Sequence, residues 1–141
     1  MEISELVKAA ATELEATIEQ EDQVFFLTVT LDDEEESDEE VASEVVMVYA
    51  DAEPSEGGET IIASVDVGVC NENLDLSAVL RGLGSVVYSR VYLGDAEEDG
   101  EHLYVEAGLP MKHLTGHDLA GVVQEVAEIA DWLDELLLET E

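Results

Sequence analysis

Basic residues are scarce in this sequence. Only four Lys and Arg stand against 37 Asp and Glu in 141 residues, which gives a formal net charge of −33. The four are Lys8, Arg81, Arg90 and Lys112. Contacts with phosphate groups and with anionic lipid need clustered Lys or Arg side chains. We therefore expect no direct binding of nucleic acid and no binding to a membrane surface.

Cysteine and long apolar runs are also nearly missing. Cys70 is the only cysteine, so an internal disulfide cannot form and nothing indicates an oxidising compartment. No apolar run approaches the ~20 residues that a membrane-spanning helix needs. The N-terminal stretch lacks the basic and apolar regions of a secretion signal. We expect a soluble, cytoplasmic protein.

Recognisable catalytic motifs are absent too. The glycines form neither G-x-x-x-x-G-K-[ST] nor G-x-G-x-x-G, and no motif links Cys70 to a histidine. Carboxylates are so frequent that any pair of them says nothing about acid–base catalysis. We predict that the protein is not an enzyme and needs no cofactor. Cys70 is interpreted as a small buried apolar residue.

What the sequence does contain is an extreme excess of acid, which has three interpretations. At ~1 M salt the Debye length falls to about 3 Å, and the mutual repulsion of such a surface is mostly screened. The composition thus resembles that of cytoplasmic proteins from halophiles that accumulate salt. The other two interpretations are an acidic secretion-type chaperone and a mimic of nucleic acid that occupies the basic groove of a DNA-binding protein.

The length and the periodic apolar residues predict one folded domain over residues 1–141. Residues 2–20 carry apolar side chains at three- and four-residue steps, which predicts an amphipathic helix. Alternating patterns predict three strands, and the connecting segments contain either acids or Pro and Gly. The strands are expected at 23–31, 43–50 and 61–69, the acidic loop at 32–40 and the turn at 52–60.

The second half predicts a short helix, a hairpin and a long helix. Asn73 or Asp75 is a possible N-cap of the short helix, and strands are expected at 86–93 and 102–107. Thr115 and Asp118 resemble a capping box, after which an apolar stripe runs for five turns. The order α-β-β-β-α-β-β-α predicts an α+β domain, with an antiparallel sheet and helices packed against it.

Residues 94–106, GDAEEDGEHLYVE, resemble an EF-hand loop that starts at Asp95. A calcium loop lies between two helices, whereas both flanks of this stretch alternate with period two. Glu106 would lie inside a strand, on the same face as His102. We interpret the stretch as the turn of a β-hairpin. In such a turn, Asp95, Glu97 and Asp99 would bind a cation weakly at most.

His113 and His117 are four residues apart, a spacing that suits a metal ion on a helix. Thr115 is expected to cap the helix, so His113 would lie outside it and the pair need not share a face. We interpret both as solvated histidines and predict no metal site.

Tyr88, Arg90 and Tyr92 form a stripe of aromatic and basic character in an otherwise acidic chain. One interpretation is a sheet face that meets a partner. The other is a half-buried strand face packed within the monomer.

Residues 71–93, NENLDLSAVLRGLGSVVYSRVYL, and residues 102–131, HLYVEAGLPMKHLTGHDLAGVVQEVAEIAD, resemble the YbjN-like domain family. The shared features are an Asn-containing stretch before a short helix, a hairpin, a Leu-Pro, a Leu-Thr turn and a long final helix. The fold of this family is similar to that of class I type III secretion chaperones. The resemblance implies a small, often dimeric α+β scaffold that binds protein segments and has no catalytic residues.

We therefore predict a non-enzymatic protein-interaction module, chaperone- or adaptor-like or regulatory in role, from a halophile-like proteome. It would bind a protein or peptide partner and form a homodimer through the short helix and the hairpin. The alternative is an acidic mimic of nucleic acid that inhibits a DNA-binding protein, which would lose its partner as salt rises. The candidate interface residues are Leu76, Leu80, Leu83, Tyr88, Arg90, Tyr92 and Tyr104.

Overall fold

The structure is a computed structural model that describes residues 2–31, 43–50, 59–70, 73–96 and 100–139. The described residues form three α-helices, a short 3-10 helix and six strands. The helices are α1 (Ile3–Leu14), α2 (Leu76–Gly82), the 3-10 helix η1 (Leu83–Ser85) and α3 (Gly116–Glu139). The strands are β1 (Thr17–Glu21), β2 (Val24–Thr30), β3 (Ser43–Ala50), β4 (Thr60–Val69), β5 (Arg90–Ala96) and β6 (Gly100–Pro110).

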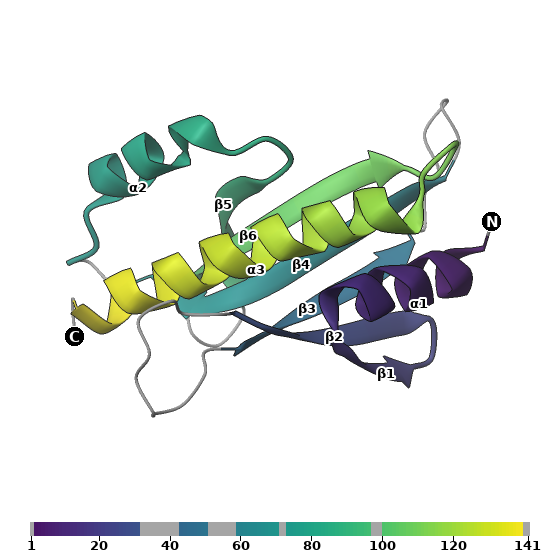
Figure 1. Cartoon of the computed structure of the whole chain (residues 1–141). Helices are drawn as coiled ribbons and strands as arrows, with labels where there is room; N and C mark the ends of the chain where they lie inside the picture. Colours follow the sequence, from purple (N-terminus) through teal and green to yellow (C-terminus); the bar gives the residue numbers. More distant parts are fainter. Residues whose placement is uncertain (1, 32–42, 51–58, 71–72, 97–99, 140–141) are drawn as a thin grey trace.

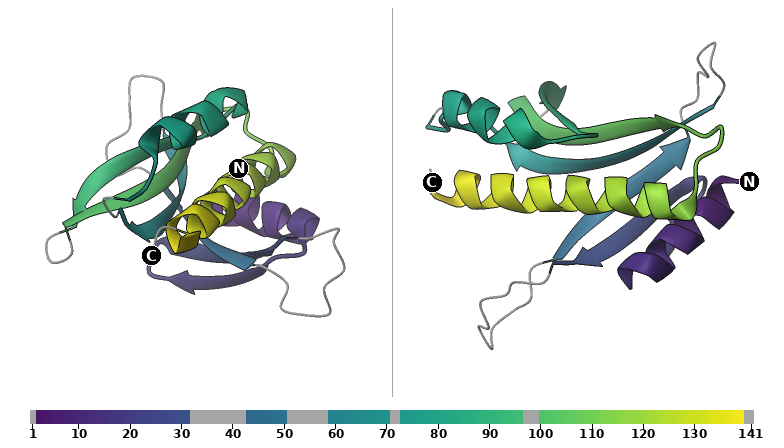
Figure 2. Two further views of the ribbon diagram at one scale, coloured as in Figure 1. Left: turned by 90° about the vertical axis from the view of Figure 1, so that its left-hand side faces the viewer. Right: turned by 45° about the horizontal axis from the view of Figure 1, so that its top comes forward.

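The six strands form one antiparallel sheet in the order β1-β2-β3-β4-β6-β5. α3 runs across one face of this sheet, and α1 packs beside its N-terminal half (Figure 1). α2 lies beside the C-terminal half of α3 (Figure 2). We call the opposite face of the sheet the open face, because no helix of the described residues covers it.

The core lies between α3, α1 and the helix-facing side of the sheet. Alternation sends every second residue of each central strand toward the helices, as the period of a β-strand requires. Fully buried examples are Leu27, Val46, Val48, Leu103 and Val105 on the strands, with Val122, Val126 and Leu133 on α3.

The predicted α+β class and the predicted order of elements are confirmed, with one strand more than expected. The first helix was expected to run to residue 20, but it ends at Leu14. Glu15 takes the left-handed conformation with φ 55°, and the N–H of Ala16 donates to Ala11 O at 2.9 Å. Thr17–Glu21 then pairs with β2, so Ile18 belongs to a strand and not to the helix.

The strand predicted at 86–93 is wrong in its first half, since β5 begins only at Arg90. The N–H groups of Val87, Tyr88 and Ser89 donate to the Glu125 carboxylate, so these residues are held by α3 and not by a neighbouring strand. The hairpin itself is confirmed, because β5 and β6 pair from Arg90↔Glu106 to Ala96↔Gly100.

Both predicted helix starts are confirmed. Asp75 is the N-cap of α2 and accepts a hydrogen bond from Ala78 N at 3.1 Å. Thr115 and Asp118 exchange the two hydrogen bonds of a capping box, at 3.1 and 3.2 Å. The predictions for the acidic loop 32–40, for most of the turn 52–60 and for Glu97 and Asp99 fall on residues outside the described ranges.

Candidate interaction surface

α2 packs against the rest of the domain with one side only, and its other side is exposed to solvent. Val79 is 2% exposed and packs into the core, and Leu74, directly before the helix, is also buried. On the outer side Leu76 is 45% exposed and Leu80 is 70% exposed. Because residues four apart share one face of a helix, these two leucines present a single apolar strip to solvent.

Gly82 sets the distance between α2 and α3. A Cβ atom at this position would lie 2.3 Å from Cη2 of Trp132, a separation that real Cβ atoms do not reach. The indole of Trp132 therefore lies directly against the backbone of α2, where any larger residue would push it away. Leu83 faces the same groove and is half-buried, so it supports α2 and is not part of the exposed strip.

Glu125 of α3 fixes the segment between η1 and β5. Its carboxylate accepts the N–H groups of Val87 at 3.0 Å, Tyr88 at 2.9 Å and Ser89 at 2.8 Å. Burial raises the pKa of Glu125, but the hydrogen bonds from this segment outweigh burial and hold the pKa below its ordinary value. The backbone of Tyr88 and Val87 is held by Glu125, while their side chains are 48% and 74% exposed to solvent.

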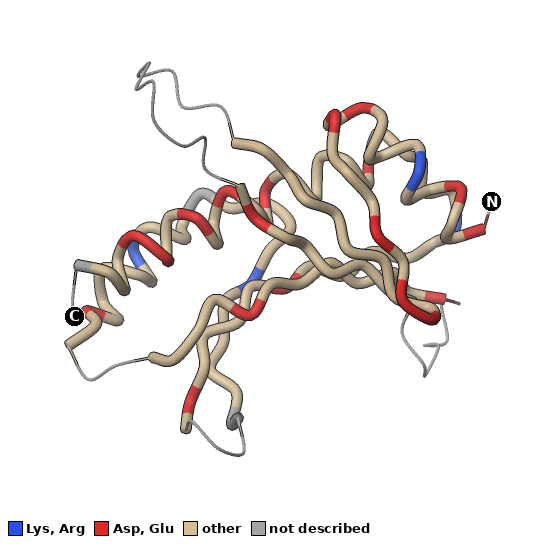
Figure 3. Tube along the Cα trace, turned by 90° about the horizontal axis from the view of Figure 1, so that it is seen from below, with Lys and Arg blue, Asp and Glu red and all other residues tan. Residues whose placement is uncertain are grey.

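The exposed apolar residues concentrate in one segment of the chain. Of the nine large hydrophobic residues that are exposed in the described structure, six lie between Leu76 and Leu93. Residues 76–94 contain no Asp or Glu, whereas acids are spread over helices and strands elsewhere (Figure 3). We call residues 76–94 the acid-free segment. Its exposed apolar members are Leu76, Leu80, Val87, Tyr88, Tyr92 and Leu93.

A row of stacked side chains crosses β5 and β6 on the open face. The Arg90 guanidinium lies 5.6 Å from the centroid of the Tyr92 ring, which stacks on Tyr104 at 5.2 Å. Tyr104 in turn stacks on His102 at 6.2 Å, and His102 contacts Asp66 at 2.9 Å. Gly94 lies directly against this row, since a Cβ at this position would be 2.6 Å from the Tyr104 ring.

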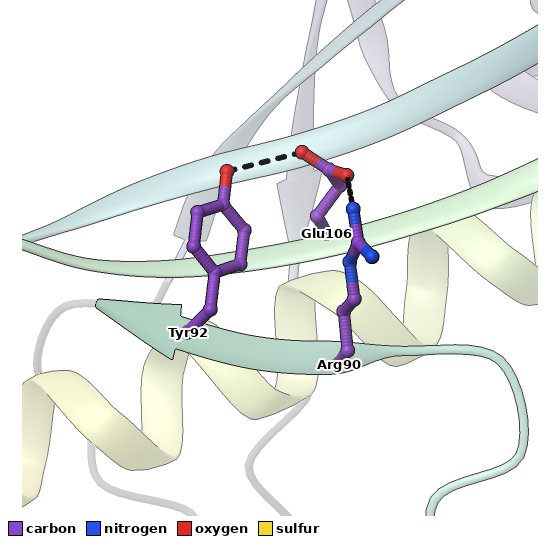
Figure 4. A network of polar contacts seen from close by, with 3 residues as sticks. All are labelled: Arg90, Tyr92 and Glu106. Atoms are coloured by element: carbon purple, nitrogen blue, oxygen red, sulfur yellow. Dashed lines mark hydrogen bonds and ion pairs between the residues drawn. The ribbon is translucent and has the colours of Figure 1, made fainter. Parts of the chain in front are cut away.

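Glu106 connects two members of this row (Figure 4). It forms an ion pair with Arg90 and accepts a hydrogen bond from Tyr92 Oη at 3.1 Å. Burial, followed by the charge of Glu106, raises the pKa of Tyr92, so this phenol stays protonated and remains a donor. The hydrogen bond to Glu106, with its charge, likewise raises the pKa of Arg90.

Five of the seven predicted interface residues fall into two groups, and Leu83 lies in the groove against Trp132. Arg90, Tyr92 and Tyr104 lie together on the open face, while Leu76 and Leu80 lie on α2, in the helix layer. Tyr88 does not share a strand face with Arg90, contrary to the predicted stripe, because Glu125 holds it outside β5. Sequence reasoning missed Val87, Leu93 and Glu125. The absence of acids from residues 76–94 is the signal that would have found the first two.

The other sequence candidates are separated by the fold. His113 has φ 65° in the turn before α3, whereas His117 lies on the helix with Nδ1 2.5 Å from Glu13 Oε1 of α1. The hydrogen bond to Glu13 raises the pKa of His117. Among the described residues, no group of three or more His, Cys, Asp or Glu has the geometry of a metal site. Cys70 is half-buried against the core, and burial raises the pKa of its thiol.

Comparison with known proteins concerns the fold. No protein-family model and no curated protein matches the sequence. The Yersinia pestis type III secretion chaperone SycH, solved in complex with a stable fragment of YscM2, superposes with a TM-score of 0.53 at 22% identity, over 94% of this chain and 98% of that one. YbjN of E. coli superposes with a TM-score of 0.55 at 16% identity, over 94% and 89%.

This is the fold of SycH and YbjN. The resemblance predicted from residues 71–93 and 102–131 is thus confirmed for the fold. At such identities the SycH and YbjN likeness describes the scaffold and not the activity. None of the described helices of this scaffold is long and apolar enough to cross a membrane.

Proposed function

We propose that this protein is a non-enzymatic, homodimeric binding module, chaperone- or adaptor-like, that holds an extended segment of another protein. The observation that carries the proposal is the clustering of exposed apolar side chains in the acid-free segment. Large exposed apolar patches on a soluble domain mark interaction sites. The segment contributes two such surfaces, because Leu76 and Leu80 lie on α2 and Tyr92 lies on the open face. In a chain with a net charge of −33, another molecule can approach the α2 strip with little repulsion.

The proposed occupant of α2 is a second copy of the chain. A twofold interface is self-complementary, so each surface residue meets the same surface of its partner. Any surface rich in carboxylates would then face carboxylates, whereas the acid-free segment brings Leu76 and Leu80 against their own copies. The dimer would be favoured by salt, since screening weakens the remaining repulsion.

The open face is the proposed site for the client segment. Phe26, Met47 and Ile62 are half-buried on this face, next to Val45, which is 50% exposed. SycH was solved with a fragment of another protein bound, which supports a client role for the same scaffold here. The client would be an extended segment with apolar side chains, because the centre of this face is apolar.

The experiment that tests this function uses a permanently unfolded acidic protein, reduced and alkylated α-lactalbumin, in molar KCl. Wild-type protein should bind this probe, and Val45→Ser should weaken binding. Leu138→Ser, a change at a 67% exposed leucine on α3, is the matched control and should leave binding intact. Absence of binding to the unfolded probe, together with capture of a basic DNA-binding protein that is lost as salt rises, would support the nucleic-acid mimic in its place.

A further inference from the structure

The sheet has two edge strands, β1 and β5, and they differ in charge. β1 carries Glu19 and Glu21, and Asp22 follows it directly, so a strand that approached this edge would meet carboxylates. Residues 90–94 of β5 belong to the acid-free segment. Charged side chains on an edge strand oppose pairing with another chain. β1 has this protection, whereas the only charge among residues 90–94 is Arg90, which is already paired.

The outer edge of β5, which does not face β6, offers backbone groups and apolar side chains to a further strand. β6 is the only strand that pairs with β5 in the described structure, so every second residue of β5 directs its N–H and C=O away from the sheet. Leu93 is 40% exposed, although Leu103, directly opposite it on β6, is 1% exposed. Tyr92 is likewise covered by Tyr104 on one side and 40% exposed. Both side chains are open where β5 has no neighbour.

Symmetry limits how a second copy of β5 can align with this edge. A twofold axis perpendicular to the sheet makes the two strands antiparallel and keeps each residue on its own face. Opposed residues point to the same face, so the axis passes through a residue and not between two. An axis at Tyr92 pairs residues 90–94 with their copies and leaves Asp95 outside. An axis at Leu93 would place Asp95 opposite Val91, and an axis at Val91 would pair residues 90–92 alone.

With the axis at Tyr92, each side chain meets one that it fits. Tyr92 lies beside its own copy, which continues the aromatic row of the open face across the two chains. Arg90, whose side chain is 72% exposed, lies opposite Gly94, which has no side chain. On the helix side, Val91 lies opposite Leu93 and covers its exposed part. Aromatic and aliphatic pairs of this kind stabilise a sheet.

We propose that β5 pairs with β5 of a second copy around an axis at Tyr92, so that the two sheets become one and the two open faces form one surface. This pairing rests on the homodimer of the proposed function and gives that dimer its register. α2 and β5 both lie toward the side of the molecule opposite β1, so one twofold axis brings both into the interface (Figures 1 and 2). The joined open faces lengthen the surface available to an extended client.

Cysteine crosslinking in molar KCl tests the register. In a Cys70→Ser background, Tyr92→Cys should form an intermolecular disulfide on mild oxidation, because opposed residues have Cα atoms ~4.5–5.5 Å apart, within the range for a disulfide. Leu93→Cys should crosslink far less, since an offset of two residues places its copies about 8 Å apart. Val45→Cys, on a strand inside the sheet and 50% exposed, is the control for random collision. Equal crosslinking at positions 92 and 45 would refute the register.

Amide hydrogen exchange tests the pairing in the wild-type protein, without any substitution. Where about nine-tenths of the chains are dimeric, the outward N–H groups of residues 90–94 should exchange about tenfold more slowly than in the diluted monomer, because only the monomer exposes them. The outward N–H groups of β1, at the other edge of the sheet, are the control. They should exchange at the same rate at both protein concentrations.

The outcomes separate the β5 pairing from the dimer itself. A dimer by sedimentation in which the β5 amides exchange as fast as in the monomer would refute the pairing and leave the α2 contact standing. Protection of β5 that requires added reduced and alkylated α-lactalbumin, and does not change with protein concentration, would assign the edge to a client strand in place of the second copy. A monomer at every concentration would refute the dimer and, with it, the pairing.

Discussion

Replacing Leu80 by Ser should separate the proposed dimer without weakening the monomer. Leu80 is 70% exposed, so most of its side chain is still available for burial by a partner. Complete burial of a leucine side chain contributes about 1.5–3 kcal/mol. Because a partner can bury only the part of Leu80 that is still exposed, its burial in the dimer contributes about 1–2 kcal/mol per copy. A twofold interface contains the residue twice, so the loss is about 2–4 kcal/mol, or about a 30-fold to several-hundredfold increase in the dissociation constant.

The assay is sedimentation velocity over a protein concentration series, combined with thermal unfolding at a concentration where wild type is monomeric. The melting temperature of this monomer should change little, because exposed surface substitutions usually stay within about 0.5 kcal/mol. Leu138→Ser, which removes an equally exposed leucine from α3, is the control and should dimerise like wild type. Equal dissociation constants for Leu80→Ser and Leu138→Ser would refute the assignment of α2 to the interface.

Two further predictions concern the parts that hold the acid-free segment in place. Gly82→Ala should destabilise the monomer by about 1–3 kcal/mol in chemical denaturation, because its Cβ would lie 2.3 Å from Trp132. Gly84→Ala, whose Cβ would meet no atom within 4 Å, should have little effect, and equal losses for the two would contradict the contact. Glu125→Gln should cost about 1–3 kcal/mol, since an amide cannot accept all three N–H groups, while Glu135→Gln should not. The pKa of Glu125 is lower in the folded chain than in the unfolded chain, so its contribution to stability is present above the unfolded pKa and is lost as pH falls through the folded pKa. If wild type stayed more stable than Glu125→Gln at low pH, the Glu125 carboxylate would not be the source of the difference.

Local patterns in the sequence were sufficient for most of the fold. The caps at Asp75 and Thr115 satisfy helix N–H groups with neighbouring side chains, so their signal lies within a few residues. The apolar alternation of β2 and β4 likewise reflects burial on one face. The helix end at Glu15 was missed because helical spacing continues to Ile18, while pairing with β2 decides the structure there.

Part of the candidate interface could be proposed from the sequence, but Val87, Leu93 and the arrangement of the residues could not. Leu76, Leu80 and Tyr92 are exposed as an interface requires. The separation of Tyr88 from Arg90 depends on Glu125, a residue 36–38 positions away that no local pattern connects to this segment.

The mass of the wild-type protein in solution tests the central claim most directly. Sedimentation equilibrium in molar KCl should give twice the chain mass of 15.3 kDa, about 31 kDa, and the dimer should weaken as salt is lowered. A mass of 15.3 kDa at every protein and salt concentration would contradict the account.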